Sequence, residues 1–163
     1  MSINRNGVYN KTMEITPYQI VSFSIILIFS LILSVQDLKR QSVMLYVQAI
    51  SILCAIVCQV IFLRAECWIY ILTSLFMGGF YFFVRMITKN KLGMADVWFG
   101  IFQGLFLTPF FVPVCLGIEA VAALCMIKKI GRKTFPFIPF MSLGLIITVI
   151  APRIVSALEA FFR

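Results

Sequence analysis

Two aspartates occur in the chain, Asp37 and Asp96, and each stands where an apolar run meets a cluster of Lys and Arg residues. A carboxylate at the edge of hydrocarbon is costly and therefore marks a candidate functional site. Two carboxylates that share one proton can hydrolyse a peptide bond, because one activates water while the other donates a proton to the carbonyl oxygen. Partial desolvation raises a carboxyl pKa and proximity separates the two values, so one group can stay protonated near neutral pH. We therefore predict an aspartyl dyad, with two solvated helix-end residues as the alternative.

The composition predicts a membrane protein. The chain is 62% hydrophobic and 12% charged, with a mean hydropathy of +1.05, so too little polar surface is present to cover a soluble domain of 163 residues. The net charge of +8 is spread over short clusters between the apolar runs. This distribution is typical of loops that face the cytoplasm and anionic lipid, and no soluble module remains to bind nucleic acid.

The cysteines do not have the spacing of a metal site. The chain has five cysteines and no histidine, and no two cysteines form a CxxC pair. We therefore expect no metal and no cofactor, and we interpret the cysteines as small apolar residues. One membrane domain is expected over 1–163, with a polar segment at 1–17, a transmembrane core at 18–151 and a tail at 152–163.

The apolar runs predict an all-α, polytopic bundle of six transmembrane helices. The runs lie at about 18–36, 43–63, 67–84, 97–127 and 135–151. A single straight helix over 97–127 would be about 46 Å long, against a hydrocarbon core of about 30 Å. Pro109 and Pro113 offer a turn within this run, so we divide it into a fourth and a fifth helix.

The basic residues predict the orientation of this bundle. With six helices, one side of the membrane holds nine of the fourteen basic residues: Lys39, Arg40, Arg85, Lys89, Lys91, Lys128, Lys129, Arg132 and Lys133. The positive-inside tendency makes this side cytoplasmic, which places the amino terminus outside and both aspartates at the cytoplasmic face. The apolar spacing in the tail predicts a helix in the outer membrane interface or an extension of the sixth helix.

Two polar residues are expected at membrane depth, Gln103 in the fourth helix and Glu119 in the fifth. A buried Glu in a membrane is usually neutralised or paired, so we expect these two side chains to hydrogen-bond to each other in a structural role. Glycine pairs at Gly100 and Gly104 and at Gly78 and Gly79 predict faces on which helices pack closely.

Three segments together resemble one family. Asp37 ends the first run and is followed by Lys39 and Arg40, and the fourth helix opens on the sequence GMAD, with Gly93, Ala95 and Asp96. The last run opens on FPFIPF, which contains Pro136 and Pro139. In this order and spacing, over about 18–150, the chain resembles the type IV prepilin peptidases, which are membrane aspartyl proteases with a GxGD motif. The resemblance is to the short members, which lack the domain with paired CxxC motifs.

The resemblance implies a function and a site. Asp37 and Asp96 would be the catalytic pair, with Gly93, Ala95, Lys39, Arg40, Pro136 and Pro139 as supporting motif residues. The substrate would be a pilin-like precursor whose basic leader is cut at the cytoplasmic face of the cytoplasmic membrane, typically after Gly and ahead of an apolar helix. Ala95 stands where the motif has its second glycine, and Trp98 stands where the family usually has a basic residue.

Two other classes of function remain open. The first is a non-catalytic relative that acts as an assembly partner in the same secretion apparatus. The second is a small transporter or channel-like protein in which Asp37 and Asp96 bind a cation. A transporter would be expected to carry an inverted repeat and essential polar groups near the midplane, and the sequence has no internal repeat.

Overall fold

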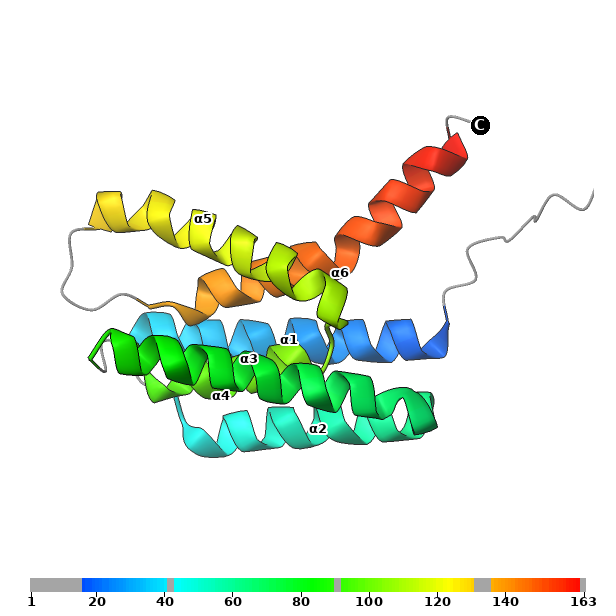
Figure 1. The fold of residues 1–163 in the computed structure, drawn as a ribbon, viewed down its shortest axis with the longest axis horizontal. Helices are drawn as coiled ribbons and strands as arrows, with labels where there is room; N and C mark the ends of the chain where they lie inside the picture. The colour runs from blue at the N-terminus through cyan, green and yellow to red at the C-terminus, as the bar shows by residue number, and fades with distance from the viewer. Residues whose placement is uncertain (1–15, 41–42, 90–91, 131–135, 162–163) are drawn as a thin grey trace, which may run out of the picture.

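The protein folds into a bundle of helices (Figure 1). The computed structural model describes residues 16–40, 43–89, 92–130 and 136–161, and these residues form six α-helices and no strand. The α-helices are α1 (Pro17–Arg40), α2 (Leu45–Leu63), α3 (Cys67–Ile87), α4 (Met94–Gly104), α5 (Val112–Ile130) and α6 (Ile138–Phe161), with short 3₁₀ turns η1 (Arg64–Glu66) and η2 (Pro109–Phe111). The predicted all-α class is therefore confirmed for the described residues.

Both aspartates lie at the same end of the bundle. Successive helices alternate in direction, so one end collects the last turns of α1 and α3 and the first turns of α2, α4 and α6, at the left of Figure 1. Asp37 lies in the last turns of α1 and Asp96 in the first turn of α4. Lys39 in the last turn of α1, Arg85 in the last turn of α3 and Lys89 just after α3 lie at the same end, as the charge pattern predicts.

Within the part of the chain that the structure describes, two helical segments are long and apolar enough to cross a membrane. The first is α1, and the second is Leu45–Ile87, each with a hydropathy of 2.2 over its most apolar window. Leu45–Ile87 is a hairpin of α2 and α3, because the chain reverses at η1, where Arg64 has a φ of 46°. Large apolar side chains such as Leu31, Leu45 and Trp68 are two-thirds exposed on the outer faces of these helices, which favours contact with lipid.

The prediction that all six helices span the membrane is not confirmed, because α4 is short. Its 11 residues correspond to about 16 Å, roughly half the thickness of the hydrocarbon core. The predicted division of the 97–127 run is confirmed. Proline lacks a backbone N–H and forces the preceding residue into an extended conformation, and Thr108 before Pro109 has φ −78° and ψ 154°. Pro113 is tolerated because it lies in the first turn of α5.

The short helix α4 is enclosed by its neighbours, and α3 contacts it most closely. A Cβ atom at Gly100 would collide with the ring of Tyr81, and one at Gly78 would collide with Ile101. At Gly104, a Cβ atom would lie 2.7 Å from the backbone nitrogen of Ser74. Gly78, Gly100 and Gly104 therefore allow the close approach of α3 and α4, as predicted, whereas Gly79 faces open space.

We expect Gly104→Ala to destabilise the fold by about 1–3 kcal/mol, because backbone atoms of α3 cannot move aside as a flexible side chain could. Gly79→Ala is the matched control, since its Cβ would meet nothing within 4 Å and alanine is the better helix former. Thermal unfolding in detergent measures both. Equal midpoints for the two variants would contradict the close packing at Gly104.

The tail continues the last helix. α6 runs without interruption to Phe161, and Figure 1 shows its carboxyl-terminal part turning away from the bundle. Pro152 lies inside α6, where the missing N–H and the bulk of the ring favour a bend. The tail is therefore a helical extension of α6, and its place in the outer membrane interface stays a prediction.

Candidate active site

Asp37 is buried because it lies on the inner stripe of α1. This stripe repeats every three or four residues and consists of Ser22, Ile26, Ser30, Leu33 and Asp37. The helix continues past the expected end of the apolar run at 36, so Asp37 is a residue of α1. Asp37 is only 8% exposed. Its Oδ2 accepts a hydrogen bond from the backbone N–H of Ile138, the first residue of α6, at 3.2 Å. Asp37 therefore caps a helix that is 101 positions away in the sequence.

Asp96 is the third residue of α4 and is 7% exposed. Its Oδ2 accepts a hydrogen bond from the backbone N–H of Gly93, the residue before the helix, at 2.9 Å. This bond is the carboxylate half of a capping box. The local sequence thus fixes the side chain at the helix start, with the carboxyl group facing the interior of the bundle.

The two carboxyl groups interact electrostatically. Asp96 lies outside the two segments that are long enough to span a membrane. Burial raises the pKa of its carboxyl from 3.8 to about 7, and the negative charge of Asp37 adds to the rise. The Gly93 N–H and the Arg85 guanidinium oppose the rise. A substantial fraction of Asp96, about half at pH 7, is therefore protonated and available as a general acid.

Two polar side chains outside the predicted motifs bond to the backbone next to Asp96. Gln48, in the first turn of α2, donates to the Ala95 carbonyl at 2.7 Å. Arg85 donates to the Leu92 carbonyl at 2.7 Å and so closes the loop between α3 and α4. Gln48 could have been suspected from the sequence, since an uncharged polar residue inside an apolar run usually bonds to a neighbouring helix.

The supporting motif residues divide into two groups. Lys39 and Arg40 are exposed in the last turn of α1, where cations complement the helix dipole. Pro136 and Pro139 are partly buried around the start of α6, next to the Ile138 N–H that Asp37 binds. Trp98 is partly buried on α4.

Ala95 adopts an ordinary helical conformation. The non-glycine residues with positive φ among the described residues are Arg64 and Lys89, and Ala95 lies within α4. Nothing at this position requires glycine, so we expect Ala95→Gly to change any cleavage rate by less than about tenfold, or about 1.4 kcal/mol in barrier. Glycine should lower stability by about 0.5–1 kcal/mol through its greater chain entropy. An inactive wild-type protein that this substitution activates would show that Ala95 disables the site.

The predicted hydrogen bond between Gln103 and Glu119 is present and belongs to a larger buried network. Glu119 is 1% exposed, and it also accepts hydrogen bonds from the Tyr81 hydroxyl and, at 3.1 Å, from the Cys115 thiol. Gln103 Nε2 donates further to the Met141 carbonyl at 2.9 Å. The network therefore joins α3, α4, α5 and α6, which supports the structural role predicted for Glu119.

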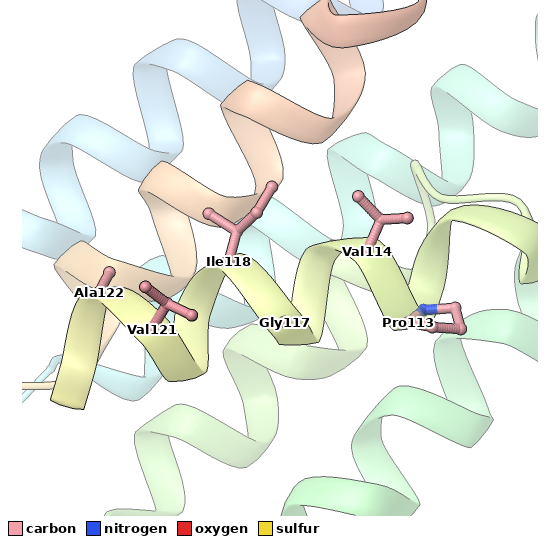
Figure 2. Close-up of a pocket in the computed structure, with 6 residues that line it drawn as sticks. All are labelled: Pro113, Val114, Gly117, Ile118, Val121 and Ala122. Atoms are coloured by element: carbon pink, nitrogen blue, oxygen red, sulfur yellow. The ribbon is translucent and has the colours of Figure 1, made fainter.

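One hollow on the surface lies away from the aspartates. It has a volume of about 450 Å³ and is formed by one side of α5 (Figure 2). Its lining is Pro113, Val114, Gly117, Ile118, Val121 and Ala122. Because these residues carry no titratable side chain, the hollow offers no catalytic group. Among the residues that the structure describes, no three His, Cys, Asp or Glu side chains gather in a cluster that could hold a metal ion.

The site thus consists of two buried carboxyl groups, from α1 and α4, at one end of the bundle. Each carboxyl accepts a hydrogen bond from a backbone N–H. Gln48 and Arg85 donate hydrogen bonds to backbone carbonyls next to Asp96. No protein-family model, curated protein or solved structure matches the chain, so its resemblance to the prepilin peptidases rests on the motifs at Asp37, Asp96 and Pro136–Pro139.

Proposed function

We propose that this chain is a membrane aspartyl endopeptidase that removes the basic leader of type IV prepilin-like precursors. The observation that carries the proposal is the pair of buried aspartates, because the negative charge of Asp37 helps to raise the pKa of Asp96 to about 7. Two interacting carboxyls, one of which keeps its proton to a higher pH, are the arrangement that acid–base catalysis uses. The order of the three motifs along the chain adds the substrate class.

In this mechanism, Asp96 is the acid and Asp37 is the base. Asp37 takes a proton from a water molecule, whose oxygen attacks the scissile carbonyl carbon, while Asp96 gives its proton to the carbonyl oxygen. As the tetrahedral intermediate collapses, one of its hydroxyl groups returns a proton to Asp96, the C–N bond breaks, and the leaving amine takes the proton held by Asp37. Each hydrolysis consumes one water and returns the dyad with one proton.

The capping bonds support a second candidate, a non-catalytic relative that acts in assembly. Each carboxyl accepts one N–H at a helix start, from Ile138 and from Gly93, and a purely structural Asp would do the same. The two candidates differ in what the carboxyl oxygens do beyond capping. In the peptidase, each aspartate must expose its other carboxyl oxygen, the one that does not accept the capping N–H, to water and substrate.

The direct test uses the purified protein in lipid vesicles with a synthetic precursor. The peptide carries a Lys- and Arg-rich leader that ends in Gly, followed by about 20 apolar residues. We expect two products whose masses locate a single cut after the leader. A matched peptide with an acidic leader is the specificity control. An intact precursor after prolonged incubation would exclude the peptidase and leave the assembly candidate.

We further propose that the site faces the cytoplasm. In a background without the five native cysteines, we expect Lys39→Cys and Lys89→Cys to be protected from a membrane-impermeant thiol reagent applied to intact cells. Arg64→Cys, at the opposite end of the bundle, should be labelled. Labelling after cell lysis confirms that each thiol is accessible. The reverse pattern would place the site outside.

A further inference from the structure

The first turn of α2 contacts the residues that precede the two aspartates. The Gln36 side chain, one residue before Asp37, accepts a hydrogen bond from the backbone N–H of Met44 at 3.3 Å. Gln48 donates to the carbonyl of Ala95, one residue before Asp96, at 2.7 Å. Met44 is the N-cap of α2, and its carbonyl accepts the backbone N–H of Gln48 at 3.4 Å. A continuous chain of hydrogen bonds therefore runs from the neighbour of one aspartate to the neighbour of the other.

The hydrogen bond from Gln48 is a second bond to a carbonyl oxygen that already accepts one within α4. Ala95 lies inside α4, where its carbonyl belongs to the helix ladder, and a carbonyl oxygen has a second lone pair for another donor. The Gln48 side chain is 3% exposed, so its amide is held in place by packing. A bond of this kind contributes mainly to the position of α4 relative to α2.

A second buried glutamine on α2 makes a comparable bond at the other end of α4. Gln59 is 1% exposed and donates to the carbonyl of Leu105, the residue after the last turn of α4. Leu105 lies beyond the helix, so Gln59 satisfies a carbonyl at the helix end that would otherwise be buried without a partner. Gln48 and Gln59 thus hold the two ends of the same short helix from the same neighbour.

We infer that Gln48 is the positioning residue of the site: through the Ala95 carbonyl it fixes the first turn of α4 and thereby the place of the Asp96 carboxyl relative to Asp37. Gln59, at the far end, stabilises α4 without directing the carboxyl. This inference rests on the proposed peptidase function for its kinetic part. Its structural part concerns the Asp96 carboxyl alone and can be tested without a substrate.

The test compares Gln48→Met with Gln59→Met, since methionine has nearly the shape of glutamine and no amide. For cleavage of the synthetic precursor, we expect Gln48→Met to lower kcat about tenfold or more with KM within about twofold, because small misplacements of a catalytic group are costly. Gln59→Met should lower the unfolding temperature and leave kcat within about twofold. If Gln48→Met does not accumulate, Gln48→Asn, which retains the amide on a shorter stem, replaces it with the same expected direction.

The substrate-free measurement is the titration of Asp96, followed by the infrared band of its protonated carboxyl. The band is identified by its loss in Asp96→Asn. We expect Gln48→Met to lower the titration midpoint of Asp96 by about one pH unit, because a looser first turn admits water and separates the two carboxyls. Gln59→Met should titrate like the wild type.

These two measurements distinguish the failures. A wild-type protein that does not cleave the precursor overturns the proposed peptidase, while a shifted midpoint in Gln48→Met still supports the positioning role. An unshifted midpoint overturns the positioning role, even in an active enzyme. Equal losses of kcat in the two glutamine variants would show a general effect of bundle stability and would also overturn it.

Discussion

Asp37→Asn and Asp96→Asn should each reduce cleavage of the precursor by about 1,000-fold or more. Asparagine cannot exchange a proton with water or with the scissile carbonyl oxygen, so each substitution removes one half of the acid–base pair. Its side-chain oxygen can still accept the capping N–H, from Ile138 at Asp37 and from Gly93 at Asp96. The variants should therefore insert and accumulate like the wild type, which separates loss of chemistry from loss of fold.

The control for this prediction is the substitution of each aspartate by alanine. Alanine removes the cap as well as the carboxyl group, so Asp37→Ala and Asp96→Ala should also lose about 0.5–2 kcal/mol of stability. Cleavage rates and unfolding temperatures are measured on the wild type and these four variants in the same vesicles. Near wild-type cleavage by either asparagine variant would contradict the aspartyl mechanism.

Cleavage should fall steeply as the pH rises above about 7. The pKa of Asp96 is raised to about 7 by burial first and by the charge of Asp37 second, so the acid form is lost above that value. Each further pH unit removes about nine-tenths of the protonated groups, and the rate at pH 9 should be about 100-fold below the rate at pH 6. A pH series of initial rates measures this. A flat profile up to pH 9 would contradict Asp96 as the acid.

The same raised pKa has a consequence for folding stability. The native state keeps the Asp96 proton to a higher pH than the unfolded chain, so stability falls as the pH rises from about 4 to about 7. Asp96→Asn lacks this carboxyl and should show a flatter dependence over the same range. Unfolding temperatures measured alongside the rates therefore separate titration of the acid from loss of structure.

The sequence predicted those parts of the fold that local patterns control. The apolar runs located the helices, and Pro109 and Pro113 located the break between α4 and α5, because proline acts on its own neighbourhood. The hydrogen bond between Gln103 and Glu119 could be predicted because a polar side chain in an apolar bundle is costly unless it bonds to another polar group.

The sequence could not predict the contacts that surround the site. The point at which α4 ends depends on its packing against α2 and α3. At that end, the Leu105 carbonyl accepts a hydrogen bond from Gln59, which is distant in sequence and near only in the folded bundle. The bond between Asp37 and the start of α6 joins residues that are 101 positions apart. The burial of both carboxyl groups, which raises the pKa of Asp96, follows from this packing and from no local motif.

If Asp37 and Asp96 act as one catalytic unit, a comparison of the single and double asparagine variants will show it. Cleavage rates are measured for the wild type, Asp37→Asn, Asp96→Asn and the protein with both substitutions. Groups that act as a unit are not additive, so each single variant should be as inactive as the double variant. Independent losses that multiply in the double variant, or a double variant that still cleaves the leader, would contradict the dyad.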